Sequence, residues 1–119
     1  MTKTYQVEVD GLAPVPAEGR PDLVRAMQQL EVPGRDFLVV SRADEDYAQA
    51  YQHGPEDWQV EYREGSADRH YRAVDLQSRE RAEELLWGWI SGEPAWHDEV
   101  AWRRLTPEDL NGSEDSENS

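Results

Sequence analysis

Glu61, Arg63, His70 and Arg72 are the residues whose types and spacing come nearest to a chemical site. They alternate along two neighbouring predicted strands, and residues two apart on a strand point to one face of a sheet. A carboxylate beside an imidazole can take a proton from a substrate and return it. The alternative, which we favour, is a ladder of cross-strand ion pairs on a solvated face. In both interpretations these four residues form one exposed binding strip.

Three tryptophans indicate a second surface. Trp87 lies on the flank of a predicted helix, away from its apolar stripe, and Trp96 and Trp102 follow that helix along the chain. Tryptophan is enriched where proteins bind one another. We therefore expect these three residues to form a second binding strip. The alternative is a small satellite core beneath the C-terminal segment.

Other catalytic and metal-binding patterns are missing from the sequence. The chain has no cysteine, which excludes thiolate metal sites and cysteine nucleophiles. It contains neither Gly-x-Ser-x-Gly nor a glycine-rich phosphate loop. The cluster His97-Asp98-Glu99 lacks the ligand spacing of a zinc site, and Asp44-Glu45-Asp46 lacks that of a calcium loop. We predict no catalytic residue, no metal site and no cofactor.

The charge of the chain restricts its partners. With 26 acidic residues against 12 basic ones, the formal net charge is −14. Such a surface repels nucleic acid and anionic lipid, whereas it attracts a basic protein. No apolar run approaches the roughly 20 residues that a membrane-spanning helix needs, and the first residues lack the apolar stretch of a signal peptide. We expect a cytoplasmic protein that binds a protein partner, but neither nucleic acid nor membranes.

Strands account for most of the elements that would position these residues. Residues 5–9 alternate between apolar and polar, as on a half-buried strand that ends at Gly11, and residues 11–19 are typical of a loop. Residues 37–40 are apolar without a break, as on a strand covered on both faces. Turn residues then separate the segments that follow. The further strands are predicted at 36–42, 47–53, 58–63 and 69–74.

Two helices are predicted beside these strands. Pro21 suits the first helical position, and Pro33 lies beyond the end of that helix. Ser78 is a suitable N-cap for the second helix, and Gly92 suits its C-terminal cap. Between them, an apolar stripe recurs at helical spacing. That stripe consists of Ala82, Leu85, Leu86, Trp89 and Ile90. The segment from Trp96 to Leu105 is predicted to form an edge strand or a short helix.

Agreement in residue type across strands predicts how they pair. Closing the last hairpin on residues 64–67 places Glu61 opposite His70, and it gathers rings on one face and charges on the other. Closing the middle hairpin with Tyr51 opposite Trp58 adds Tyr47 and Tyr51 to the face of rings, beneath the second helix. The first hairpin adds Leu38 and Val40 to it. The opposite face then receives Phe37, Val39, Ala48 and Ala50.

The fold class that follows is α+β, with an antiparallel meander of four to six strands and helices packed on it. Residues 1–110 are predicted to form a single domain. Residues 111–119 are polar and acidic with nothing to bury, so we expect them to form a disordered tail.

Part of the chain resembles small uncharacterised proteins of high-GC bacteria. The resemblance rests on Phe37-Leu-Val-Val-Ser-Arg, Val60-Glu-Tyr-Arg-Glu-Gly, Asp68-Arg-His-Tyr-Arg-Ala, the helix Ala82-Glu-Glu-Leu-Leu-Trp-Gly-Trp and Trp102. It covers residues 36–105, and the pattern is also similar to that of bacterial toxin-immunity proteins. The resemblance implies a non-enzymatic protein that binds and blocks a toxin domain. It carries no functional residue across.

We therefore expect a non-catalytic protein-binding module, an immunity or chaperone-like factor that binds a basic protein. The alternative is a small-molecule-binding or hydrolytic domain with a pocket between the sheet and the C-terminal helix. The chain would be a monomer, or a homodimer formed through the face that carries Phe37, Val39, Ala48 and Ala50.

Overall fold

A computed structural model describes residues 4–43, 45–93 and 95–106. It is an α+β fold, with an open antiparallel sheet of seven strands in the order β2-β1-β3-β4-β5-β6-β7. The strands are β1 (Thr4–Val9), β2 (Val15–Glu18), β3 (Phe37–Ala43), β4 (Asp46–Gly54), β5 (Asp57–Glu64), β6 (His70–Ala73) and β7 (Trp102–Leu105). The α-helices are α1 (Gly19–Gln28), α2 (Arg79–Ser91) and α3 (Ala95–Asp98), with short 3-10 turns at Gln29–Glu31 and Ala67–Arg69.

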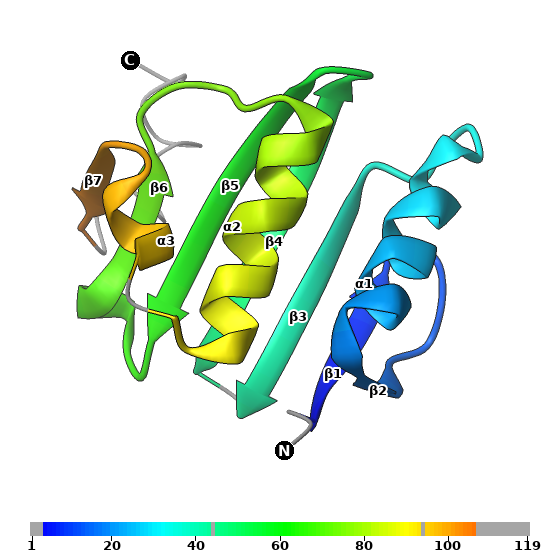
Figure 1. The fold of residues 1–119 in the computed structure, drawn as a ribbon, viewed down its shortest axis with the longest axis horizontal. Helices are drawn as coiled ribbons and strands as arrows, with labels where there is room; N and C mark the ends of the chain where they lie inside the picture. Colours follow the sequence, from blue (N-terminus) through cyan, green and yellow to red (C-terminus); the bar gives the residue numbers. More distant parts are fainter. Residues whose placement is uncertain (1–3, 44, 94, 107–119) are drawn as a thin grey trace, which may run out of the picture.

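The three α-helices lie on the same face of the sheet (Figure 1). Helix α1 packs on β1 and β2, and α2 packs on β4 and β5. We call the opposite side the back face, and no described helix covers it. Its residues follow from strand alternation and pairing: Gln6, Glu8, Phe37, Val39, Ser41, Tyr47, Gln49, Tyr51, Gln59, Glu61, Arg63, His70, Arg72, Arg103 and Leu105.

Local sequence explains the ends of α2. The Ser78 side chain accepts a hydrogen bond from the backbone N–H of Arg81, which is the N-cap interaction predicted for that residue. Gly92 ends the helix at φ 80°, a left-handed conformation that glycine adopts without strain. The predicted stripe faces the sheet, because all five of its residues are buried. They are Ala82, Leu85, Leu86, Trp89 and Ile90.

Helices α2 and α3 approach closely at a glycine. A Cβ atom placed on Gly88 would lie 2.3 Å from the Cβ of Trp96. Real Cβ atoms do not come this close. Trp96 can therefore occupy its position only because residue 88 has a hydrogen in place of a Cβ atom. Trp96 in turn packs edge-on against Tyr62 and Trp102. The glycine therefore connects α3 to the core beneath it.

The sheet is wider than expected at both edges. Residues 15–18 lie in the segment predicted as a loop, but they form β2 and pair with β1. At the other edge, the segment after α2 contains both of the predicted alternatives, α3 and then β7. The strand count is therefore seven, in place of four to six. Pro16 lies in the edge strand β2, and Arg103 and Arg104 lie in the edge strand β7.

The predicted register of β4 was wrong by one residue. Gln52, in place of Tyr51, pairs with Trp58, and the register shifts between Gln52 and Gly54. A one-residue slip moves every side chain of a strand to the other face. Ala48 and Ala50 are therefore buried beneath the helices with Leu38 and Val40, whereas Tyr47 and Tyr51 lie on the back face.

The predicted register of β5 with β6 was displaced by two residues. Arg63, in place of Glu61, pairs with His70, and Glu61 pairs with Arg72. A slip of two residues leaves every side chain on its predicted face. Trp58, Val60 and Tyr62 accordingly lie on the helical side and are buried.

The remaining predictions about the chain concern its ends and membranes. The tail predicted at 111–119, and the domain end at 110, lie outside the described residues. Within the residues described, no helix is both long and apolar enough to cross a membrane.

Candidate functional site

A buried carboxylate lies near the middle of the back face. The side chain of Glu61 comes from β5, and the residue is only 8% exposed. Its Oε1 accepts hydrogen bonds from His70 Nε2 at 2.7 Å and from Gln49 Nε2 at 3.1 Å. Its Oε2 accepts a third hydrogen bond from the Gln59 amide. Three donors therefore satisfy a charge that burial alone would penalise.

His70 connects this carboxylate to an arginine. His70 is 1% exposed, and its Nδ1 accepts a hydrogen bond of 3.1 Å from Arg63 Nε. An accepting nitrogen carries no proton, so the proton of the ring is on Nε2, from which it is donated to Glu61. Both ring nitrogens are thus used within the protein. In this arrangement His70 has no open nitrogen with which to take a proton from a substrate.

Tyr47 and Glu45 complete the group around Arg63. Arg63 Nη1 lies 2.5 Å from Glu45 Oε1, and the guanidinium lies over the Tyr47 ring, 5.5 Å from its centroid. The Tyr47 ring also meets His70 edge-on, at 6.0 Å between centroids. Burial raises the pKa of Tyr47. We call Gln49, Gln59, Glu61, Arg63, His70 and Tyr47 the back-face network.

The surroundings of Glu61 alter its pKa in opposing directions. Burial raises it, whereas hydrogen bonds from His70, Gln59 and Gln49 lower it, and the net result is a lowered pKa. The ionised carboxylate therefore stabilises the folded chain at pH values above the ordinary glutamate pKa of about 4.3. That contribution is lost as the pH falls through the lower pKa of the folded state.

Glu61→Gln is therefore expected to lose stability in a pH-dependent way. The variant keeps the size of the side chain but has no ionised form, so wild type should be the more stable at pH 7. The difference should shrink as the pH is lowered below about 4. Urea denaturation at pH 7, 5, 4 and 3 measures it. Glu80→Gln, an exposed carboxylate on α2, is the control. A Glu61→Gln difference that stays constant down to pH 3 would contradict the assigned pKa direction.

The structure brings together three of the four residues of the first predicted strip. Glu61, Arg63 and His70 form one chain of hydrogen bonds. Arg72 lies on the same face, opposite Glu61 on one side and Arg103 on the other. Among the described residues, Arg72 makes no ion pair with Glu61. Because Glu61 and His70 are buried, the strip is less exposed than expected.

An exposed aromatic group lies on the same face, toward β3. The rings of Phe37 and Tyr51 are stacked at 5.9 Å between centroids, and the His53 ring lies 5.3 Å from Tyr51. Tyr51 is 43% exposed, and Phe37 and Val39 are half-buried. The sequence prediction missed Tyr51 here because of the β4 slip. We call Phe37, Val39 and Tyr51 the aromatic patch.

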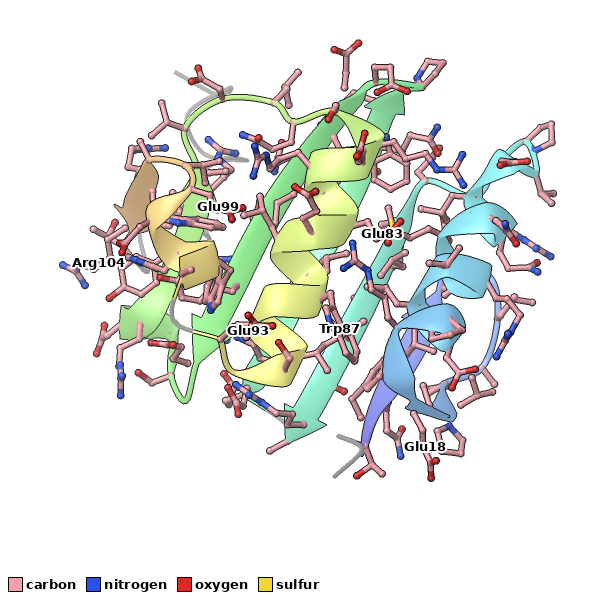
Figure 2. The ribbon with its side chains drawn as sticks, in the orientation of Figure 1. Glu18, Glu83, Trp87, Glu93, Glu99 and Arg104 are labelled. Carbon is pink, nitrogen blue, oxygen red and sulfur yellow. The ribbon has the colours of Figure 1, made fainter. Side chains whose placement is uncertain are left out.

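The second predicted strip is not one surface. Trp96 and Trp102 do meet, at 5.5 Å between ring centroids, and both contact Tyr62. The Trp102 Nε1–H donates to the His97 carbonyl at 2.8 Å. Trp87 lies apart from them, on the side of α2 that is turned toward α1 (Figure 2). All three are half-buried against the core, so the alternative of a satellite core describes Trp96 and Trp102 better.

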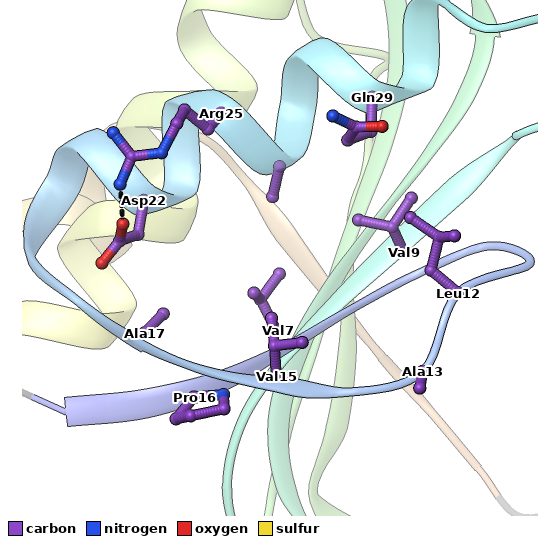
Figure 3. Close-up of a pocket in the computed structure, with 11 residues that line it drawn as sticks. Val7, Val9, Leu12, Ala13, Val15, Pro16, Ala17, Asp22, Arg25 and Gln29 are labelled. Carbon is purple, nitrogen blue, oxygen red and sulfur yellow. Dashed lines mark hydrogen bonds and ion pairs between the residues drawn. The ribbon is translucent and has the colours of Figure 1, made fainter.

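The alternative function needs a pocket between the sheet and the predicted C-terminal helix, which is α2. Buried side chains fill the space between α2 and the sheet. Trp58, Leu86 and Ile90 are buried there. A groove of about 570 Å³ lies instead beside α1, against the β1–β2 hairpin (Figure 3). No pattern in the sequence predicted this groove, because its shape depends on how the loop between β1 and β2 leaves the sheet. Within the described ranges, no group of three His, Asp or Glu side chains is arranged to hold a metal ion.

Comparison with known proteins provides no analogue for either surface. No family of proteins, no curated protein and no solved structure matches this chain.

Proposed function

We propose that this chain is a non-catalytic protein-binding module that docks a basic partner protein on the back face of its sheet. The observation that carries the proposal is the aromatic patch, in which the exposed Tyr51 ring stacks on the half-buried Phe37 ring on a face that no described helix covers. Apolar rings left on a surface in this way are typical of protein interaction sites. Phe37 and Tyr51 would be the anchors that a partner buries.

Charge around the aromatic patch favours a basic partner. Glu8 is exposed and lies directly opposite Val39 of the patch. Asp10 and Asp36 are adjacent at one end, where the backbone N–H of Asp36 donates to the Asp10 carboxylate at 2.9 Å. The net charge of −14 would also speed the encounter with a positively charged protein.

The back-face network supports binding rather than catalysis. Its hydrogen bonds hold Gln49 and Gln59 in place beside Tyr51, since Tyr51 pairs directly with Gln59 across the strands. Side chains that are already ordered lose less entropy when a partner arrives. Both ring nitrogens of His70 are engaged within the protein, so the imidazole has no open nitrogen to act as a base, which favours a non-catalytic role.

A toxin is the partner that an immunity function would require. Such a partner would be a basic toxin domain whose activity falls when the chain is bound. A second copy of the chain is a less favourable partner, because it would bring together two molecules that each carry a charge of −14. Light scattering distinguishes these outcomes, since only the second gives a dimer of the isolated chain.

Replacing both anchors should remove partner binding. We expect the double variant Phe37→Ser/Tyr51→Ser to weaken the affinity for the partner at least about tenfold, because each ring contributes buried apolar area at the interface. The experiment uses wild type and variant as baits in the same lysate, followed by titration of each purified captured protein. Val74→Ser/Leu76→Ser is the control, because these apolar side chains are also exposed but do not belong to the aromatic patch.

The outcome that supports the proposal is a basic protein captured by wild type and the control but not by the double variant. Capture of the same proteins by all three baits would contradict it, and so would the absence of any captured basic protein at low salt. Unchanged melting temperatures of the baits would show that the variants are folded.

A further inference from the structure

The groove beside α1 is formed because the β1–β2 hairpin opens. The two strands pair only as far as Val7 and Val15, while β1 continues to Val9 alongside β3. The chain between them arcs away from the sheet and returns as β2 (Figure 3). Helix α1 closes the other side. The groove, about 570 Å³, is lined by Val7, Val9, Leu12, Ala13, Val15, Pro16, Ala17, Asp22, Arg25, Ala26 and Gln29.

The lining of this groove is mostly apolar and is partly open to water. Val7 and Val9 form its floor and are nearly buried. At its rim, Leu12 is 42% exposed and Val15 is 50% exposed. Water in contact with this surface would be released by an apolar ligand. A volume of this size lies in the range of roughly 300–1,000 Å³ that is typical of small-molecule sites.

A second cavity, lined by both polar and apolar groups, continues from one end of the groove. It has a volume of about 510 Å³ and shares Pro16, Ala17, Asp22 and Arg25 with the apolar part. Beyond this shared boundary, it is lined by Thr4, Glu18 and Pro21. The two cavities thus form one elongated site along the seam between α1 and β2. One half is apolar, and the other, which we call the polar half, also carries polar and charged groups.

The described residues that line the polar half carry a net negative charge. Asp22 is an ion-pair partner of Arg25, and its Oδ2 also accepts a 2.7 Å hydrogen bond from the backbone N–H of Glu18. The positive charge of Arg25 is therefore already balanced. The exposed Glu18 carboxylate has no ion pair among the described residues. Among the side chains that the structure describes, a ligand that reaches this half would therefore meet one negative charge without an ion pair.

We propose that this site binds an amphipathic amine, with its apolar body between the hairpin and α1 and its protonated amine beside Glu18. A carboxylate would have to compete with Asp22 for Arg25 and would approach Glu18 against like charge. A neutral alcohol would bury the same apolar body but would lack the attraction to Glu18. The site lies on the helical side of the sheet, so it is independent of the partner-binding face proposed above.

The test compares three probes of equal chain length: octylamine, octanol and octanoate. Each is titrated into the ¹⁵N-labelled full chain, and two-dimensional NMR follows the backbone amides. We expect octylamine to shift the amides of β1, β2 and α1 in a saturable way, with octanol weaker and octanoate weakest. Glu18→Gln should weaken octylamine binding about threefold and leave octanol binding unchanged, as for one exposed ion pair.

Glu93→Gln is the matched control, because it removes one exposed carboxylate at a distance from the groove (Figure 2). It should leave octylamine binding unchanged. Equal weakening by Glu18→Gln and Glu93→Gln would overturn the proposal, since it would indicate a general charge effect. Shifts that spread over the acidic surface without saturating would overturn it too, as would octanoate binding as tightly as octylamine.

A second variant tests the apolar half. Ala26 lines the groove from α1, so Ala26→Leu should fill it and abolish binding of both octylamine and octanol. Leu12→Ser removes apolar surface from the exposed rim and should weaken both probes without disturbing the core. If neither variant affects binding, the apolar body of the ligand is not in this groove and the proposal is wrong.

Discussion

Replacing His70 with alanine is expected to lower the free energy of unfolding by about 3 kcal/mol, the loss typical when one partner of a buried polar pair is removed. His70 is 1% exposed, and its imidazole donates the shorter of the two hydrogen bonds to Glu61 Oε1, at 2.7 Å. Its removal also deprives Arg63 Nε of its acceptor and leaves a cavity against Tyr47.

Urea denaturation at pH 7 measures this loss, and His53→Ala is its control. His53 lies on the same strand as Tyr51 but is exposed, so its replacement should change the free energy of unfolding by no more than about 0.5 kcal/mol. If His70→Ala and His53→Ala were equally stable, the back-face network would not contribute to the fold. Its role in ordering Gln49 and Gln59 for a partner would then have no basis.

Replacing Gly88 with alanine is expected to lower the free energy of unfolding by about 2 kcal/mol, as for an overpacked core position. In an ordinary helix, the same change would stabilise the chain by about 1 kcal/mol, because alanine is the better helix former. Here the added methyl group would overlap with the Cβ of Trp96 at 2.3 Å. Helix α3 would have to move away from α2, and the ring contacts of Trp96 with Tyr62 and Trp102 would change.

Two measurements distinguish this clash from a general loss of helix stability. Near-ultraviolet circular dichroism should change in Gly88→Ala, since it reports the packing of Trp96 and Trp102. The double variant Gly88→Ala/Trp96→Gly should lose less stability than the sum of its single variants, because the overlapping atom is gone. A Gly88→Ala variant that melts higher than wild type would show that the two helices are not in such close contact.

The predictions from sequence were most successful where one strong pattern determined the structure. The apolar stripe from Ala82 to Ile90 and the caps at Ser78 and Gly92 predicted α2 correctly. On β5 and β6, alternation placed Trp58 and Glu61 on their correct faces even though the pairing was displaced by two residues. The α+β class followed from these elements, and its antiparallel sheet is confirmed.

The failures involve features that depend on contacts between distant segments. The register of β4 shifts between Gln52 and Gly54, and no residue type in that stretch indicates such a shift. Tyr47 and Tyr51 have the character of core residues, but α2 packs so close to the sheet that the alanines at 48 and 50 fit beneath it. The composition of a strand alone does not reveal how near a helix will approach it.

The candidate site was predicted only in part for the same reason. Glu61, Arg63 and His70 were identified from their alternation, but Gln49 could join them only once β4 was in its true register. The groove beside α1 depends on where the β1–β2 pairing stops, which is decided by the path of the loop and not by any periodic pattern.

The edge strands limit how another chain can attach to this sheet. Pro16 has no N–H to offer an added strand, and β2 contains only four residues. At the opposite edge, Arg103 and Arg104 follow one another on β7 and are both exposed, and charge at an edge opposes pairing with a further strand. Both edges therefore oppose the edge-to-edge pairing of sheets that leads to fibrils, even though no described helix covers the back face.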